Sequence, residues 1–435
     1  MNARKMKQSS ILGIGEIPSH WTTKNIGYLF SERTQCSLPN EDWELLSVSE
    51  YYGVAPKKEK ISTDDFLTRA ESLVGYKICQ PGDLVSNIML TWKGALGVTN
   101  YRGIVSPAYC VYRPNEQIVP RYVHYLFRTK AYTTLFKAYS TGIIESRLRL
   151  YTDKFFKLQC VLPPKNEQIA IANFLDSKCA EIDALTADIE KQIETLQEYK
   201  KSVITEAVTK GLDPNVEMKD SGVEWIGFIP NSWKLSRIKY GTNKIGSGKT
   251  PKGGAETYVD EGIAFLRSQN VYETGLVLDD VAYITPVTHE LMASSKVKPL
   301  DVLLNITGGS IGRCCVVPES FLEANVNQHV CIIRADKCLP DWIKFFWNSI
   351  PGQYSISRLQ GSANREALNF EEIANTYLPI PPLPEQQLIV TFLKKKSEQI
   401  EITMLEKQKM LDILSNYKQS LIYEYVTGKK TVPNA

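Results

Sequence analysis

The clearest pattern of apolar and polar positions lies in residues 167–208, a stretch without glycine or proline. Apolar side chains recur there at spacings of three and four, which places them on one stripe of a long amphipathic helix: Ile182, Leu185, Ile189, Ile193, Leu196, Tyr199 and Val203. Pro163 and Pro164 precede the stretch, with Asn166 as a suitable cap, and Gly211 follows it as a stop signal. A lone helix of this length cannot bury its stripe, so the pattern predicts a partner.

The same pattern returns 218 residues later, in residues 385–426, which makes the second copy the obvious partner. Glu167 and Gln168 return as Glu385 and Gln386. A helix pair that merely supports a larger fold is the plainer alternative. We expect the two helices to pack through Ile182, Leu185, Ile189, Leu196, Tyr199, Val203, Ile400, Leu414, Tyr417 and Leu421.

The repeat extends beyond the helices. The opening SSILGIGEIPSHWTTKNIGY (9–28) returns as SGVEWIGFIPNSWKLSRIKY (221–240), with the IGxIPxxW pattern intact. The chain is therefore two copies of one module. We predict four regions: a globular domain at 1–162, a helical region at 163–215, a second globular domain at 216–380 and a second helical region at 381–435.

The interiors of the two globular domains differ far more than the helices do. A skeleton still survives, because IVSPAYCVYRPN (104–115) aligns with NVNQHVCIIRAD (325–336). The runs ALGVT, YCVY, HVCII and VLLNI are typical of buried strands, whereas PRYVHYLF and PDWIKFFW are typical of short amphipathic helices. We predict an α/β (α+β) domain on a small mixed or antiparallel sheet in each half. A shared scaffold with diverged interiors suits a recognition protein with two different targets.

Composition sets broad limits on the class of protein. Hydrophobic content of 43% and charged content of 23% are ordinary for a globular protein, and no run of eighteen apolar residues predicts a membrane span. Nine cysteines without a CxxC pair, together with only four histidines, indicate neither a disulfide framework nor a zinc site. We expect a cytoplasmic protein with free thiols, no metal and no cofactor of its own.

Charge is distributed unevenly along the chain. Residues 93–157 carry 11 basic and 3 acidic side chains, interleaved with tyrosines and directly preceded by Trp92, a composition that suits binding to a polyanion. Solvated surface lysines would give the same count. Residues 216–380 carry 16 basic and 18 acidic side chains, so a nucleic-acid surface in the second domain has to be a local patch.

Several strings in the sequence resemble catalytic motifs without completing them. The string IGSGKT (245–250) resembles a phosphate loop, but Asn243 stands where the motif needs glycine. Asp83 and Asp301 resemble catalytic carboxylates, but their places in PGDLVSN and PLDVLLN favour turn acids before a strand. Serine-elbow, zinc-helix, dinucleotide-loop and amino-methyltransferase motifs are missing from the sequence. The sequence therefore predicts a protein that is not itself an enzyme.

Taken in order, the motifs resemble the DNA-specificity subunits of Type I restriction–modification systems. The likeness rests on the paired IGxIPxxW openings, LSVSEYYGV (46–54), the SPAY and NQHV segments, the paired P-x-EQ helix entrances, and GKTPK followed by GIAFLRSQNV. It implies two target-recognition domains joined by helices that pack as an antiparallel coiled coil. Each domain would read one half of a bipartite, asymmetric DNA site, with the spacing set by the helices.

The resemblance also implies the partners. Two copies of a separate modification subunit would methylate adenine with S-adenosylmethionine, and restriction subunits would use ATP to translocate and cleave double-stranded DNA. Our candidate DNA contacts are Lys57, Lys58, Trp92, Lys93, Arg147 and Arg149 in the first domain, and Lys249, Lys252, Arg267, Gln269, Arg313 and Arg365 in the second. The rival hypothesis is a duplicated coiled-coil adaptor without a DNA role; binding to DNA at low salt that is lost as salt rises would distinguish the two.

Overall fold

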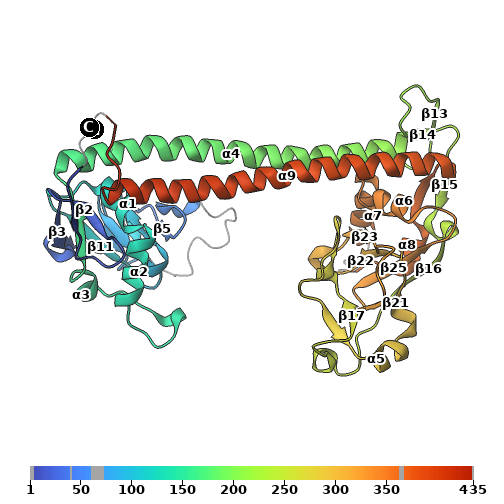
Figure 1. The fold of residues 1–435 in the computed structure, drawn as a ribbon, viewed down its shortest axis with the longest axis horizontal. Coiled ribbons are helices and arrows are strands. Elements are labelled where there is room, and N and C mark those ends of the chain that lie inside the picture. Colours follow the sequence, from blue (N-terminus) through green and yellow to red (C-terminus); the bar gives the residue numbers. More distant parts are fainter. Residues whose placement is uncertain (1–3, 40–41, 60–72, 362–366, 434–435) are drawn as a thin grey trace. The chain divides into compact units, whose positions relative to one another are not determined.

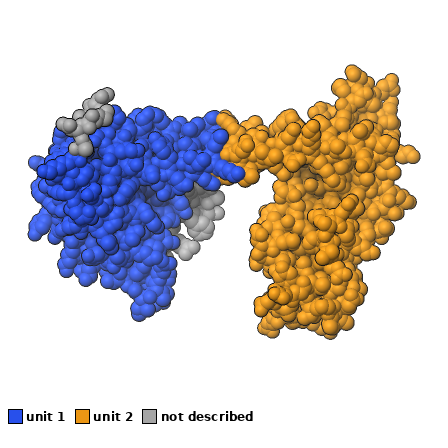
Figure 2. All heavy atoms as spheres, in the orientation of Figure 1, with its two compact units in different colours: residues 1–189, 409–435 blue, residues 190–408 orange. Residues whose placement is uncertain are grey.

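The structure of the chain is a computed structural model that describes residues 4–39, 42–59, 73–361 and 367–433 (Figure 1). The chain forms two compact units, coloured separately in Figure 2. Unit 1 comprises Met1–Ile189 and Lys409–Ala435, and unit 2 comprises Glu190–Gln408. Each unit therefore combines a globular domain from one repeat with helix segments from both. The predicted domain boundaries stay a prediction.

Two long helices carry the repeated pattern: α4 (Lys165–Lys210) and α9 (Leu383–Val426). They run antiparallel, because residue numbers rise along α4 as those of its partners fall along α9: Phe174 with Tyr425 and Asp183 with Lys418 in unit 1, and Gln192 with Lys407 and Lys200 with Glu401 in unit 2. The predicted pair of antiparallel helices joined to mixed α/β domains is confirmed.

The residues predicted to pack the helix pair differ in exposure. Buried ones face the partner helix or the domain below it: Ile182, Ile189, Ile400 and Leu421. Leu196, Val203 and Leu414 are half-buried. Leu185, Tyr199 and Tyr417 remain about half exposed, at 47%, 47% and 53%. A two-helix seam shields only the positions that point directly at the partner, so the outer rows of a wide stripe keep contact with solvent.

The helix ends depend on glycine. Gly211 follows α4 with φ of 78° and Gly428 follows α9 with φ of 73°, the left-handed conformation that ends many helices, as the sequence predicted. Asn166 lies inside α4, which begins one residue earlier, so its expected capping role was wrong. A Cβ on Gly428 would lie 2.4 Å from the Cδ atom of Pro18. The end of the second repeat thus packs against the opening motif of the first.

Among its described residues, the domain of unit 1 contains short strands and three α-helices. Its main sheet is antiparallel, in the order β4 (Phe30–Glu32), β11 (Cys110–Pro114), β8 (Leu84–Ser86) and β9 (Leu96–Val98). Smaller antiparallel pairs surround it: β1 (Met6–Gln8) with β2 (Glu16–Pro18), β3 (Thr22–Asn25) with β12 (Gln159–Leu162), β5 (Leu46–Ser49) with β6 (Gly53–Pro56), and β7 (Lys77–Cys79) with β10 (Gly103–Val105). The helices are α1 (Pro120–Phe127), α2 (Lys130–Tyr139) and α3 (Thr152–Phe155).

The domain of unit 2 repeats this arrangement. Its main antiparallel sheet is β16 (Thr242–Ser247), β25 (Val330–Ala335), β22 (Val302–Asn305) and β23 (Cys314–Val316). Two of the smaller strand pairs are also repeated. The pair β1–β2 returns as β13 (Met218–Asp220) with β14 (Phe228–Pro230), and the pair β3–β12 returns as β15 (Lys234–Arg237) with β26 (Tyr377–Ile380). The helices are α5 (Pro286–Leu291), α6 (Pro340–Trp347), α7 (Ile350–Gly361) and α8 (Phe370–Asn375).

The repeats diverge in a second sheet, which is larger in unit 2. There β20 (Ala282–Ile284), β17 (Ile263–Leu266), β24 (Ala324–Val326) and β21 (Lys296–Val297) form a mixed sheet in which β17 and β24 run parallel. A short hairpin, β18 (Val271–Tyr272) with β19 (Gly275–Leu276), lies between these strands in the chain. The expected small mixed or antiparallel sheets are therefore confirmed in both units.

The repeated motifs attach each domain to its helix segments. The indole N–H of Trp21 donates to Glu167 over 3.0 Å, and that of Trp233 donates to Glu385 over the same distance. The buried Gln168 amide accepts from the backbone N–H of Val119 and donates to the Pro163 carbonyl. Gln386 makes the equivalent bonds to Leu339 and Pro381. The IGxIPxxW motif therefore contacts the P-x-EQ motif directly, once in each unit.

Within the described part of the chain, no helix combines the length and the apolar composition that crossing a bilayer requires. All nine cysteines are free thiols, and only Cys36 among them is exposed.

Candidate nucleic-acid interface

Several predicted contact residues of unit 2 lie in loops at one edge of its main sheet. Ser247 at the end of β16 pairs with Cys331, and Asn305 at the end of β22 pairs with Val330. Three loops therefore leave the sheet at the same edge, residues 248–252, 306–313 and 327–329, because neighbouring antiparallel strands begin and end together there. We call this end of the sheet, where the strands terminate and the loop containing Gln328 lies, the 328 edge.

A chain of side-chain hydrogen bonds connects the three loops of the 328 edge. The Thr250 hydroxyl donates to Oε1 of Gln328, whose Nε2 lies 3.1 Å from Nε2 of His329. Nδ1 of His329 lies 2.6 Å from Oγ1 of Thr307. The Asn327 side chain accepts from the backbone N–H of His329 and fixes the turn below. The loops thus form one surface.

The GSGKTP sequence has a local structural reason. The backbone N–H of Gly248 donates to the Asn327 carbonyl, and a Cβ at that position would lie 1.5 Å from the Val326 carbonyl oxygen. Only glycine permits this close approach. The loop consequently lies flat against the edge, with Lys249 and Lys252 exposed beyond it.

The remaining predicted residues of the second domain are partly engaged. Arg267 donates from one terminal nitrogen to the Asp280 carbonyl, and Gln269 donates to the Asp280 carboxylate, so the exposed Asp280 engages both side chains. The exposed Arg313 guanidinium lies 4.9 Å from the centre of the Tyr272 ring. Arg365 falls outside the described residues.

Unit 1 has an equivalent edge, formed where Ser86 at the end of β8 pairs with Cys110 at the start of β11. Trp92 lies beside it, with Nζ of Lys93 5.2 Å and Nζ of Lys137 5.0 Å from the ring centre. The Leu150 backbone N–H donates to the Ile88 carbonyl. That bond brings the loop containing the predicted Arg147 and Arg149 to the same edge.

A half-buried arginine that the sequence analysis missed organises this edge. Arg128, the residue that follows α1, donates hydrogen bonds to five backbone carbonyls, those of Ser49, Glu50, Tyr51, Gly94 and Leu96, over 2.8–3.3 Å. Burial lowers the pKa of its guanidinium to about 10, so it remains charged near neutral pH. Arg128 thereby fixes the turn between β5 and β6, and Tyr51 at that turn is 84% exposed.

The turn borders a large groove in unit 1 with a volume of about 1410 Å³. Basic side chains from the domain and the helix pair line it together with Tyr51 and Trp92: Lys93, Arg121, Arg128, Lys130, Lys137 and Lys418. Glu145 pairs with Lys137 and Asp176 pairs with Arg121, which offsets part of that charge. Lys57 and Lys58 follow the open end of the β5–β6 hairpin instead, beyond the pair Leu46–Pro56.

His124 on α1 supports the same turn from below. Its Nδ1 accepts from the Val98 backbone N–H over 3.2 Å, and its ring lies against Gly53 and Gly97. Burial, together with the nearby Arg128 and Arg121 guanidinium groups, lowers its pKa to about 3. The ring is therefore neutral in the folded domain.

The carboxylates that resemble catalytic groups are structural. Asp83 accepts from the Gln80 backbone N–H and from Arg33, whereas Asp301 accepts from the Lys298 backbone N–H and from Arg334. Each closes the turn before a strand, as the sequence predicted.

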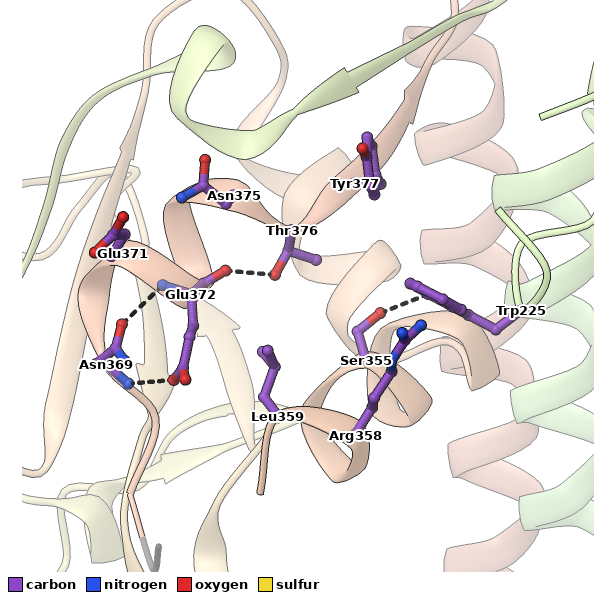
Figure 3. A pocket seen from close by; sticks show the side chains of 10 residues that line it. All are labelled: Trp225, Ser355, Arg358, Leu359, Asn369, Glu371, Glu372, Asn375, Thr376 and Tyr377. Atoms are coloured by element: carbon purple, nitrogen blue, oxygen red, sulfur yellow. Dashed lines mark hydrogen bonds between the residues drawn. The ribbon is translucent and has the colours of Figure 1, made fainter. Parts of the chain in front are cut away.

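A smaller pocket in unit 2 has a volume of about 510 Å³ and lies between α7, α8 and the Trp225 side chain (Figure 3). Its polar groups already bond to one another. The Trp225 indole donates to Ser355, Asn369 and Glu372 form a capping box, and Arg358 lies 4.4 Å from the Trp225 ring centre. We assign no ligand to this pocket.

Comparisons with known proteins find the same resemblance. Residues 230–421 match the family described as Type I restriction modification DNA specificity domain. The chain is 25% identical over 431 residues to the putative type I restriction enzyme MjaX specificity subunit of Methanocaldococcus jannaschii, covering 96% of this chain and 95% of the relative. The MjaVIII specificity subunit of the same organism is 23% identical, with 91% and 94% covered.

Solved structures agree in fold. A chain from a study of complex assembly and conformational transition of the type I R-M system matches with a TM-score of 0.71 at 15% identity, covering 95% of this chain and 99% of that one. The HsdS subunit from Thermoanaerobacter tengcongensis matches with a TM-score of 0.51, also at 15% identity, covering 95% and 98%. At this identity the likeness concerns the fold alone. The resemblance predicted from the motifs is confirmed: in sequence and in fold, this chain is similar over nearly its whole length to the specificity subunits of Type I restriction–modification enzymes.

Proposed function

We propose that this chain is the non-catalytic DNA-recognition subunit of a Type I restriction–modification complex. Domain 1–162 reads one half of a bipartite, asymmetric site and domain 216–380 reads the other. The helical regions 163–215 and 381–435 hold the two reading domains and set the spacing between the half-sites.

The observation that carries the proposal is the pair of equivalent sheet edges. Both units use the same strand order in the main sheet, but the groups at the edge differ: Tyr51, Trp92 and Lys93 in unit 1, and Lys249, Gln328 and Arg313 in unit 2. Basic side chains suit phosphates, whereas aromatic and amide groups suit base edges. One scaffold with two different polar surfaces is what recognition of an asymmetric site requires.

The partners in this proposal are double-stranded DNA, two copies of a modification subunit that methylates adenine, and restriction subunits that translocate and cleave. The near-repetition of α4 and α9 offers two similar surfaces to two identical subunits. The proposed location is the cytoplasm, where such a complex meets DNA.

The test is selection of DNA by the assembled complex. The chain, co-purified with its modification subunit, is mixed with random double-stranded DNA, and the retained molecules are sequenced at increasing salt. We expect a bipartite consensus and a steep loss of binding with salt. Retention without any consensus, or binding that salt leaves unchanged, would contradict the proposal and favour the adaptor hypothesis.

A further inference from the structure

Gln328 is an exposed amide whose orientation is fixed on both sides. Thr250 donates a hydrogen bond to its oxygen Oε1. Its Nε2 has only hydrogens to offer, so the His329 Nε2 atom, 3.1 Å away, accepts one of them. His329 then carries its proton on Nδ1, which donates to the Thr307 oxygen 2.6 Å away. These two contacts hold the amide in place, with its oxygen towards Thr250 and its nitrogen towards His329.

The bonds to Thr250 and His329 use only half of the hydrogen-bonding capacity of the Gln328 amide. An amide has two N–H donors and two acceptor lone pairs, and the two neighbours occupy one of each. Gln328 is exposed, so one donor and one acceptor of its amide remain available to a ligand. Lys249 and Lys252, also exposed, lie on the adjoining loop and suit the phosphates on either side.

We infer that Gln328 is a specificity-determining residue that reads an adenine in the half-site of the second domain. In the major groove adenine presents the N6 amino donor beside the N7 acceptor, which matches the exposed acceptor and donor of the amide. Guanine presents two acceptors there, so the amide oxygen would face another oxygen. Thymine offers an acceptor and a methyl group, and cytosine offers a single amino donor.

The comparison of the two units supports this role. Asn327 and Ser106 occupy equivalent positions, and each side chain accepts from a backbone N–H two residues later. The position after them holds Gln328 in unit 2 and Pro107 in unit 1. The turn is thus retained while the exposed group changes from an amide to a ring without a donor. That is the difference expected where two domains read different bases.

Thr250 and His329 are positioning residues in this account, because they act on DNA only through the amide. Replacing either one with a residue of similar shape, Thr250→Val or His329→Phe, frees the amide to turn over. We expect these variants to weaken the preference at one base pair without moving the consensus elsewhere.

The inference rests on the proposed function, and the experiment separates the two. The full chain assembled with its modification subunit selects sites from a random double-stranded DNA library, as wild type and as Gln328→Ala, Gln328→Glu and Lys252→Ala. We expect Gln328→Ala to lower the preference for A at one position of the second half-site by roughly tenfold or more. Gln328→Glu can only accept, so that position is expected to shift towards C. Lys252→Ala is expected to weaken all sites alike, with an unchanged consensus.

The first half-site serves as the internal folding control, since its consensus requires an assembled complex. If wild type selects no bipartite consensus, the proposed function itself fails. If wild type selects one and both Gln328 variants retain every position of the second half-site, the role of Gln328 is wrong. A change at the expected position from A to C in Gln328→Glu would establish it.

Discussion

Replacing Arg128 with methionine should loosen one turn of unit 1 and leave unit 2 unchanged. The substitution keeps most of the aliphatic side chain but removes the guanidinium that holds the carbonyls of Ser49, Glu50 and Tyr51 against those of Gly94 and Leu96. No other side chain among the described residues is recorded as donating to these five carbonyls. The turn that carries Tyr51 would lose its attachment to the start of β9.

The magnitude follows from the bonds that are lost. A hydrogen bond from a charged donor contributes a net of roughly 1.5–3 kcal/mol, and some of the five carbonyls regain water once the turn opens. Desolvation of the guanidinium, which lowers its pKa to about 10, offsets part of the gain in the wild type. We expect Arg128→Met to destabilise unit 1 by about 2–4 kcal/mol in total. Arg128→Lys should lose somewhat less, because an ammonium group has three donors and no planar fork.

Hydrogen exchange measured by mass spectrometry tests this directly. Peptides covering residues 46–56 should exchange roughly 10- to 100-fold faster in Arg128→Met, while peptides from unit 2 should match the wild type. Lys130→Met is the matched control, since Lys130 is an exposed residue that lines the same groove. Unchanged exchange at 46–56, or equal acceleration in both units, would refute the reasoning. In DNA selection, the variant should lose discrimination in the first half-site only.

Three other perturbations have defined outcomes. The folded pKa of His124 lies near 3, below the ordinary 6.5, so its contribution to stability is complete above pH 6.5 and is lost as the pH falls towards 3. The free energy of unfolding of unit 1, measured with denaturant, should therefore fall by up to about 2 kcal/mol between pH 7 and 5. His124→Gln should flatten that pH dependence. Glu167→Gln removes the charged acceptor of the Trp21 indole and should destabilise unit 1 by about 1–3 kcal/mol in the same assay, whereas Glu181→Gln, at an exposed ion pair, should leave the stability unchanged. Lys249→Ala should reduce the slope of log affinity against log salt by about 1, and an unchanged slope would exclude a phosphate contact.

The organisation of the molecule was accessible from the sequence because it repeats. Periodic apolar residues without glycine or proline predict a helix wherever they occur, so α4 and α9 followed from pattern alone. Their end glycines also followed, because a left-handed residue after a helix favours glycine. The helix start did not follow: Asn166 has the chemistry of a cap, but α4 begins one residue earlier.

The interface was predictable only in part. Exposed lysines beside turn signals can be found by type, and Lys93, Lys249 and Lys252 do lie at the two sheet edges. Arg128 and Gln328 could not be found this way, since their importance depends on partners distant in sequence: Arg128 binds loops some 30 and 80 residues away, and Gln328 meets Thr250 across the sheet edge. An arginine just after a helix, such as Arg128, and a single glutamine in a polar segment, such as Gln328, look like ordinary surface residues in the sequence. Only the folded structure shows which distant residues Arg128 and Gln328 contact.

Exchange of one recognition domain tests the central claim most directly. Residues 1–162 are replaced with the equivalent domain of a related specificity subunit whose methylated site differs in both halves, and the hybrid is expressed with the modification subunit. Sequencing of methylated adenines then gives the recognised site. The account predicts that one half-site changes to that of the donor while the other half-site stays as in the parent. A hybrid that methylates DNA with both halves changed, or with neither changed, would contradict the assignment of one half-site to each domain.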